Sequence, residues 1–504
     1  MKATLNRIRQ TLAPQDCTPW PLIVLLTPIV LFVQGYHPYA NDAGIYIAGI
    51  RKLIHPGLYR PDAPFITSHS HLSIFAPILA TFVRLTHAPF AWTILTVYLL
   101  AVALFLYASW QLATRLLASP SARFGALFMA AALYGLPVAG TALYVMDPYL
   151  TARSFSTPVD LLAVAAALDR RYLRTAALIA LSFLLHPLMA AYAFAFVTVM
   201  IAFQLGRPGI AIALCASGPI AAAIADFAVR HHPISPDYQQ AILQPEHTYL
   251  FLARWHSYEL AGAILPLILF ALAARRIGWH TPLGKVTLAA IATGISSLLI
   301  AALFVPVRGP YLLVPLQVMR INHIIYAIGL VLFGGLIGHY SAQRHWLAPA
   351  FFLAAFTGMA IAASLNFPGC RQVEWPGLTP INPWSQAFLW IRHNTPPNAI
   401  FAFNPSLIHQ PLEDEQGFRV FSERSQLPDD KDSGDVAVFP SLAPLWGSQR
   451  NAAAGINTES DAQRLARLKP YGVSWILLPP KAKTHFPCPY QNSVTKVCRL
   501  ARQK

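Results

Sequence analysis

Acidic residues are scarce in the first 370 positions of this 504-residue chain, which contain only ten Asp and Glu residues. Asp42 is the most suggestive of them, because it opens the segment DAGIYIAGIRKLI directly after the first apolar run. The apolar positions between 45 and 50 predict a helix lying at a membrane interface, with Asn41 or Asp42 near its N-cap. Asp42 therefore has two interpretations. It could cap this helix, or its carboxylate could act as a base at the membrane surface.

A second group of residues that could take part in chemistry consists of four arginines: Arg153, Arg254, Arg308 and Arg320. All four fall in predicted outer loops or at outer span ends, where the positive-inside rule disfavours basic residues. A guanidinium group binds phosphate oxygens bidentately, so an arginine at the membrane surface could hold a lipid phosphate. Snorkelling to lipid headgroups is the alternative explanation for each one.

Other polar residues in this region give weaker signals. Asp147, in MDPYLTARSFSTP, could simply form a turn before Pro148. His69 and His71 could bind a divalent ion, but no third ligand accompanies them, so we assign no metal ligand. His186 precedes a proline between two apolar runs, which predicts a turn at a span boundary.

The composition of the chain is that of a polytopic α-helical membrane protein. Hydrophobic residues make up 55% of the chain, charged residues 12%, and the mean hydropathy is +0.47. The net charge of +16 lies largely in short loops between apolar runs, and no motif for binding nucleic acid accompanies it. We expect about eleven spans in residues 1–370, at 20–36, 89–114, 124–145, 157–168, 175–186, 187–205, 209–228, 257–274, 282–304, 321–339 and 346–366.

The basic loops predict the orientation of these spans. The N-terminal MKATLNRIRQ and the first apolar run are interpreted as an uncleaved span with a cytoplasmic N-terminus. Residues 37–70 then form a long first outer loop, and Leu72–Val83 is too short for a span and is taken as re-entrant or interfacial. This topology places the basic loops in the cytoplasm and residues 371–504 on the extracytoplasmic side.

Residues 371–504 have the composition of a soluble fold, and we expect a small α/β domain. Helices are predicted at Pro383–His393 and Ala462–Lys469, and strands at Ala399–Phe403, Phe418–Ser422 and Val473–Leu478. The charged segment EDEQGFRVFSERSQLPDDKDSGD is either a solvated loop or a cover over the membrane face, in which case Arg419, Glu423 and Arg424 are the residues to test. Cys488 and Cys498 could form a disulfide in an oxidising compartment or remain two thiols.

A first span, a long outer loop with an early acid, many further spans and a C-terminal extracytoplasmic domain resemble the GT-C superfamily of membrane glycosyltransferases. Locally the resemblance rests on GYHPYANDAGIYIAGIRKLI, and the segment WIRHNTPPNAIFAF is similar to the start of the tail domain in bacterial members. The chain lacks the WWDYG-like motif of oligosaccharyltransferases, which argues against transfer to protein asparagine.

The resemblance implies a donor of the polyprenyl-phosphate-sugar type and an acceptor hydroxyl on a glycan, lipid or protein. Asp42 matches the proposed catalytic base of the superfamily, and Asp147 could be the second acid, which binds a metal or substrate hydroxyls. Arg153, Arg254, Arg308 and Arg320 would supply the phosphate site, and a divalent metal could take part. The expected location is the bacterial inner (plasma) membrane, with membrane lipids as neighbours.

Two other classes fit the same sequence. A transporter or lipid flippase would need ionisable groups deep in its spans, for which Asp160, Asp226 and Glu259 are the candidates. A non-catalytic subunit of envelope assembly would need none of these groups to be reactive.

Overall fold

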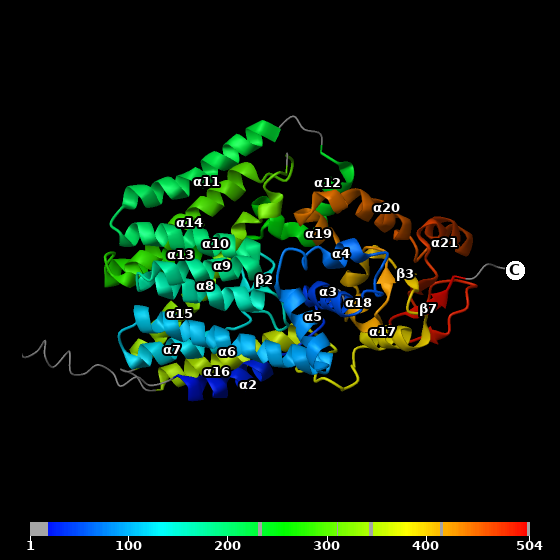
Figure 1. Cartoon of the computed structure of the whole chain (residues 1–504), viewed down its shortest axis with the longest axis horizontal. Helices are drawn as coiled ribbons and strands as arrows, with labels where there is room; N and C mark the ends of the chain where they lie inside the picture. The colour runs from blue at the N-terminus through cyan, green and yellow to red at the C-terminus, as the bar shows by residue number, and fades with distance from the viewer. Residues whose placement is uncertain (1–18, 230–233, 310, 342–345, 414–416, 501–504) are drawn as a thin grey trace, which may run out of the picture.

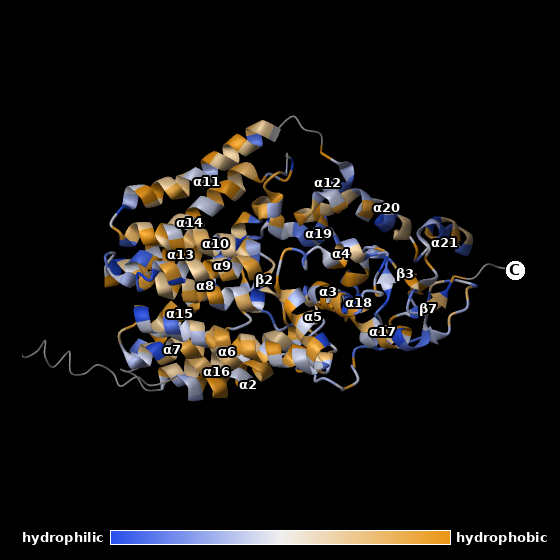
Figure 2. Cartoon of the chain, in the orientation of Figure 1, coloured by the Kyte–Doolittle hydropathy of each residue, from blue (hydrophilic) through white to orange (hydrophobic). Residues whose placement is uncertain are grey.

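The computed structural model describes residues 19–229, 234–309, 311–341, 346–413 and 417–500. The predicted cytoplasmic N-terminus, residues 1–18, lies outside them. Apolar helices fill one end of the molecule, and the C-terminal elements form the other end (Figures 1 and 2).

Seven helical segments in the described part of the chain are long and apolar enough to cross a membrane. Their outer surfaces remain apolar, as on α11 (Pro208–Val229), where Ile212 and Ile224 are 64% and 65% exposed. Apolar side chains directed outward on long helices are expected where lipid is the solvent. The long apolar helices therefore indicate a multi-pass membrane protein. The seven segments are Phe90–Leu116, Pro187–Gln204, Pro208–Ala228, Ser257–Ile277, Pro282–Phe304, Val314–Tyr340 and Leu347–Asn366.

Each of the eleven predicted spans contains a helix, although not all of these helices have spanning length. The helices are α2 (Trp20–Gln34), α6 (Phe90–Leu116), α7 (Pro120–Ala132), α8 (Arg153–Leu168), α9 (Tyr172–Leu185), α10 (Pro187–Gln204), α11, α13 (Ser257–Ile277), α14 (Pro282–Phe304), α15 (Asn322–Ser341) and α16 (Leu347–Asn366).

The predicted span 124–145 is wrong in its second half. Helix α7 ends at Ala132, and the chain then forms the hairpin of β1 (Pro137–Val138) and β2 (Leu143–Tyr144). Pro137 lacks the amide proton that a continuing helix requires, and Gly140 takes a positive φ of 64° in the turn. The tip of this hairpin therefore lies at the end of the bundle rather than inside it.

The first loop is largely helical, as predicted after Asp42. It contains α3 (Ala43–Ile54) and α4 (Ala63–Thr67), and α5 (Phe75–Thr86) coincides with the short run expected at Leu72–Val83. Every residue of α3 from Ala43 to Arg51 is buried. This helix therefore lies inside the protein, between the bundle and the C-terminal domain (Figure 1).

The C-terminal domain is built on a five-stranded mixed sheet of order β4-β3-β5-β7-β6. Strand β3 (Ile400–Ala402) pairs in parallel with β4 (Ser425–Gln426) and β5 (Trp475–Leu478), and β7 (Lys496–Arg499) pairs antiparallel with β5 and with β6 (Tyr490–Gln491). Alternate residues of β5 enter two separate apolar cores: Trp475 and Leu477 pack with α17 (Pro383–Asn394), and Ile476 and Leu478 pack on the opposite face. Both faces of the sheet are therefore covered.

Most of the predicted elements of this domain are confirmed, including α17, β3, β5 and α21 (Asp461–Leu468). The strand predicted at Phe418–Ser422 is wrong, because Gly417–Ser422 forms the helix α18. All six of its residues are buried, since the helix lies between α17 and α3. Tertiary packing here overrides the alternating pattern of the sequence.

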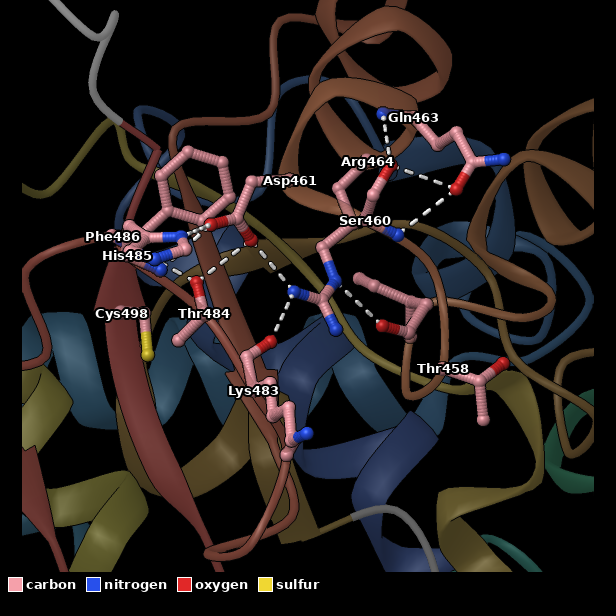
Figure 3. A network of polar contacts seen from close by, with 12 residues as sticks. Thr458, Ser460, Asp461, Gln463, Arg464, Lys483, Thr484, His485, Phe486 and Cys498 are labelled. Atoms are coloured by element: carbon pink, nitrogen blue, oxygen red, sulfur yellow. Dashed lines mark hydrogen bonds and ion pairs between the residues drawn. The ribbon is translucent and has the colours of Figure 1, made fainter.

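A polar network fixes α21 to the loop before β6 (Figure 3). Ser460 and Gln463 form a capping box at the start of this helix. Asp461 accepts hydrogen bonds from Arg464 Nη1 at 2.7 Å, Thr484 Oγ1 at 2.8 Å and the His485 amide at 2.7 Å. A disulfide joins Cys488 to Cys498 on the neighbouring strand, one of the two states that the sequence allowed.

The first loop and the C-terminal domain are joined at several points. Tyr36 pairs with Val373 in a parallel bridge, and Arg419 of α18 reaches Asp62 of the loop at 2.8 Å. In its described residues, 417–435, the charged segment therefore covers the first loop rather than forming a solvated loop. The remaining elements are α12 (Pro236–Ile242), η1 (Pro245–Leu250), η2 (Leu252–Arg254), η3 (Val314–Leu316), η4 (Val318–Ile321), η5 (Pro405–His409), α19 (Ser433–Val438), η6 (Pro440–Leu442), α20 (Ala443–Ala453) and η7 (Lys469–Tyr471).

Candidate active site

Asp42 lies at the N-cap position of α3, but its side chain makes no capping hydrogen bond. Its carboxylate instead has two cationic neighbours. Lys431 Nζ lies 3.6 Å from Oδ1, and Arg153 Nη2 lies 3.4 Å from Oδ2. The side chain of Asp42 is 29% exposed. Of the two interpretations of Asp42, the geometry favours a carboxylate that can contact a ligand.

Asp147 and Arg153 form a buried ion pair beside Asp42. Arg153 Nη2 donates to Asp147 Oδ2 at 2.8 Å, and the two side chains are 4% and 2% exposed. Asp147 lies in the loop between β2 and α8, and Arg153 is the first residue of α8. The guanidinium thus joins both predicted acids, and Asp147 fixes its orientation.

Asp42, Arg153 and Lys431 line a cavity of about 1040 Å³ between the bundle and the C-terminal domain, and Asp147 lies behind Arg153 without lining it. Its polar part brings together α3, the α4–α5 connection, η1, η4 and the segment around α19. Its apolar part comes from the β1–β2 hairpin and from the chain at the α9–α10 junction, including Leu188 and Ala191. A cavity with charged groups at one side and apolar residues at the other suits an amphiphilic ligand.

Arg320, in η4, is the cavity cation without a carboxylate partner among the described residues. Its guanidinium lies 5.3 Å from the ring centroid of Tyr249, and its Nε is buried with no hydrogen-bond partner. Leaving a guanidinium N–H unsatisfied costs free energy, and an anion in the cavity would recover it.

The structure brings only part of the predicted set together. Asp42, Asp147, Arg153 and Arg320 gather at the cavity, although Asp147 acts there through Arg153. Arg254 and Arg308 do not line the cavity: Arg254 packs over Phe251 and donates to the Leu243 carbonyl, and Arg308 is exposed.

Sequence reasoning missed several cavity residues, and the two charged ones from the C-terminal domain, Lys431 and Asp435, both come from its charged segment. The only signal for them was the density of charge between positions 413 and 435. The three residues singled out there are structural instead: Arg419 pairs with Asp62 and Asp432, Glu423 pairs with Arg51, and Arg424 donates to the carbonyls that end α17.

Burial and neighbouring charges shift the pKa of Asp42, Asp147 and Glu246, each in a direction with a clear cause. Burial would raise the pKa of Asp42, but Lys431, Arg153 and Arg320 together hold it well below its usual range. For Asp147, burial dominates and raises its pKa despite Arg153. Burial likewise raises the pKa of Glu246 in η1. Of these three acids, Asp42 is therefore the one that its surroundings hold in the ionised form.

The cavity acids do not fit a divalent metal held between them, because the guanidinium of Arg153 already occupies the space between Asp42 and Asp147 and carries the positive charge. Among the described residues, one other group could hold a metal: His37, Cys370 and Glu374, whose ligand atoms lie within 4.8 Å of one another. It does not line the cavity, and it joins the first loop to the linker after α16.

Apart from His69, the remaining ionisable candidates lie outside the group of charges around Asp42, although His186 and Glu259 line the cavity. His186 lies at the boundary between α9 and α10, as predicted, and accepts a hydrogen bond from the Met189 amide. Glu259 completes a capping box at the start of α13, and Asp160 is buried within α8. His71 is exposed and does not line the cavity, whereas His69 does.

No protein-family model and no curated protein matches this chain. Among solved structures, the archaeal oligosaccharyltransferase AglB from Archaeoglobus fulgidus, in complex with an inhibitory peptide and a dolichol-phosphate, aligns with a TM-score of 0.47 and 11% identity, covering 92% of this chain and 69% of that one. The same organism's enzyme tethered to an acceptor peptide aligns with a TM-score of 0.46 and 11% identity over the same shares. Its complex with Zn and sulfate gives 0.42 and 12% identity, covering 91% and 68%. The similarity is distant, so the assignment of chemistry depends on the cavity itself.

Proposed function

We propose that this protein is a membrane glycosyltransferase that moves a sugar from a polyprenyl-phosphate donor to an acceptor hydroxyl, with inversion at the anomeric carbon. The C-terminal domain and the cavity lie on the extracytoplasmic side in this proposal. The disulfide between Cys488 and Cys498 supports that placement, because disulfides persist in oxidising compartments.

The observation that carries the proposal is Arg320. Its guanidinium lines the cavity, forms no ion pair with a carboxylate among the described residues, and lies with Arg153 and Lys431 near Asp42. Three cations near one carboxylate suit a phosphate diester, which carries one negative charge and offers oxygens to a planar guanidinium. As the sugar–phosphate bond breaks, the same cations stabilise the charge that develops on the leaving phosphate.

Asp42 is the base in this mechanism. It removes the proton from the acceptor hydroxyl as the hydroxyl oxygen attacks the anomeric carbon. The cations that lower its pKa would make it a weak base in the empty cavity. A bound phosphate shares those cations and raises the pKa of Asp42, so the donor itself would strengthen the base.

The apolar lining supports a lipid-linked donor rather than a soluble sugar nucleotide. Leu188 and Ala191 line the cavity from α10, one of the helices of spanning length, and Leu72 lines it from the start of the short apolar α5 region. A prenyl chain in contact with these residues would leave its phosphate among the cations.

The test is transfer from a short polyprenyl-phosphate sugar to acceptors extracted from the envelope, with purified protein in detergent. We expect transfer by the wild-type protein, loss of about one to three orders of magnitude in Arg320→Ala, and wild-type activity in Arg60→Ala. Arg60 is the matched control, since it is exposed on the first loop and does not line the cavity. Lipid movement across vesicles without any transfer would instead favour the flippase class.

A further inference from the structure

His69 and Asp435 form an ion pair across the two halves of the protein. His69 follows α4 in the first loop, and Asp435 belongs to α19 in the C-terminal domain. His69 Nδ1 lies 2.9 Å from Asp435 Oδ1, and Ser68 Oγ donates to the same oxygen at 3.2 Å. The side chain of Asp435 is completely buried. A buried carboxylate in this position fixes Nδ1–H as the donor and sets the plane of the ring.

The other edge of the imidazole is open to the cavity. Tyr46 and Phe439 pack against the ring at centroid distances of 5.5 Å and 6.3 Å, both edge to face. The His69 side chain remains 27% exposed and lines the cavity, and Nε2 has no hydrogen-bond partner among the described residues. Nε2 is therefore the atom through which His69 can meet a ligand.

The charges that face His69 come from several elements. Burial lowers its pKa, but Asp435, which pairs with it, and Asp42 at the start of α3 raise it, so that the net direction is upward despite Arg320 of η4. Tyr46, Lys431 and His186 line the same cavity. Because the pKa is raised, the ring keeps its second proton to a higher pH than a free histidine does.

We propose that His69 donates a proton from Nε2 to the departing phosphate, and that Asp435 is the residue that positions it. This inference rests on the proposed glycosyl transfer and adds a second proton-transfer group to it. The bond between the anomeric carbon and the phosphate oxygen breaks, its electron pair stays on that oxygen, and the oxygen takes the proton from Nε2. The acceptor oxygen forms the new bond and gives its proton to Asp42.

The protons balance over one turnover. The products are the glycoside and the polyprenyl phosphate monoester with one acidic proton, and proton exchange with water returns the proton from Asp42 to His69. No oxidant, reductant or metal enters the step. Asp42 and His69 have opposite surroundings, cations around the carboxylate and a carboxylate behind the imidazole. These opposite surroundings favour Asp42 as the base and His69 as the acid within one site.

The product side of the reaction provides a test that does not depend on an acceptor. Farnesyl phosphate, a short prenyl phosphate monoester, is titrated into the full-length protein between pH 5.5 and 9 and its binding followed by intrinsic fluorescence. The variants are His69→Gln and Asp435→Asn. His71→Gln is the matched control, because His71 lies two residues away but is exposed and outside the cavity.

The quantity to compare is the ratio of wild-type to His69→Gln affinity, because the ionisation of the phosphate itself is common to both proteins. We expect this ratio to be about tenfold at low pH, the strength of one charged hydrogen bond, and to fall toward one as His69 loses its proton. The same ratio, taken between Asp435→Asn and His69→Gln, should fall at a lower pH, since the substitution of Asp435 removes the charge that raises the pKa of His69. A merely structural pair would weaken binding equally at every pH.

The outcomes separate the two proposals. The role of His69 is overturned, and the phosphate site left intact, if the affinity ratio does not change with pH. The same conclusion follows if the ratio falls at the same pH in the Asp435→Asn variant as in the wild-type protein. No binding of farnesyl phosphate by the wild-type protein overturns the proposed function and His69 with it. If His69→Gln does not fold, the ratio of wild-type to Asp435→Asn affinity decides instead, because an amide keeps an acceptor for Nδ1–H while removing the charge. This ratio should rise above one only in the pH range between the lowered and the raised pKa of His69, and a ratio that is flat with pH overturns the role of His69.

Discussion

Among the ion pairs that join the first loop to one stretch of the C-terminal domain, those around Arg419 and those around Asp42 differ in geometry rather than in residue type. Arg419 binds both oxygens of Asp432 at 2.8 Å and Asp62 at 2.8 Å, and these side chains are at most 4% exposed. Around Asp42 the contacts are longer, 3.4 Å and 3.6 Å, and the carboxylate and Lys431 are 29% and 20% exposed. The first set is closed to water, whereas a ligand can enter the second.

This difference teaches how one segment can serve two purposes. A buried guanidinium whose partners are all protein groups can only hold the two halves together, and removing either side leaves an uncompensated charge. A loosely paired carboxylate keeps lone pairs available for a substrate proton and gives up its cations to a phosphate. The pairs at Arg419 therefore fix the position of Lys431 and Asp435 at the cavity.

Substitution of the accessible carboxylate should have the largest effect. Asp42→Asn keeps the size of the side chain but removes its basicity, so transfer should fall by about two to four orders of magnitude. The free energy of unfolding should change little, because Asp42 makes no capping hydrogen bond. Transfer rates with a polyprenyl-phosphate donor and thermal unfolding of the same preparation measure both. Full activity in this variant would remove Asp42 from the mechanism.

The buried ion pairs of Arg419 should affect stability rather than transfer. Arg419→Ala leaves Asp62 and Asp432 buried without their cation, which should cost about 3–5 kcal/mol of stability. We expect a lower unfolding temperature and faster proteolysis of the C-terminal domain, compared with Arg60→Ala on the exposed surface of the same loop. Unchanged protease resistance would mean that the two halves are held together by other contacts.

Removal of Lys431 should separate binding from proton transfer. Lys431→Ala should raise the KM for the donor by about tenfold, as expected for one charge-assisted contact, with little loss of stability. Because Lys431 lowers the pKa of Asp42, its removal should also move the acid limb of activity to higher pH. Lys431→Arg, which keeps the charge, serves as the control. An acid limb that stays in place would contradict the coupling.

The smallest effect is expected far from the cavity, in the network of Figure 3. Burial opposes ionisation of Asp461, but the His485 amide, Thr484 and Arg464 lower its pKa. A lowered folded-state pKa contributes stability above the pKa of the unfolded chain, and this contribution is lost as pH falls through the folded value. Asp461→Asn should cost about 1–2 kcal/mol at neutral pH and less below pH 4, measured by thermal unfolding across pH. An equal loss at both pH values would argue against a charge effect.

Sequence reasoning found the part of the cavity that comes from the membrane half. Acids are costly in a chain of this composition, so Asp42 and Asp147 were conspicuous, and arginines at outer span ends included Arg153 and Arg320. These four residues lie close to spans whose periodicity is strong. Arg254 and Arg308 satisfied the same rule, and only tertiary packing distinguishes them.

The C-terminal contribution could not be predicted in the same way. Lys431 meets Asn41 across 390 positions of sequence, and no local pattern encodes such a pairing. Dense charge usually means a solvated loop, but here the charges neutralise one another in the interior. Packing between α17 and α3, which is also absent from any local pattern, makes Phe418–Ser422 a helix. The pair of His69 and Asp435 was hidden because the two residues lie far apart in the sequence and no local pattern links them.

The long separation between loop and partner has a consequence for biosynthesis. The first loop leaves the ribosome before any of its partners, and the Lys431–Asn41 contact requires 390 further residues. At a synthesis rate of 5–20 residues per second, this interval is about 20–80 s. During that time Asp62 and α3 have neither their cation nor their cover. A nascent chain stalled before position 419 would therefore expose a first loop without its C-terminal partners to quality-control proteases. Synthesis of the C-terminal quarter of the chain would then determine whether the first loop is degraded.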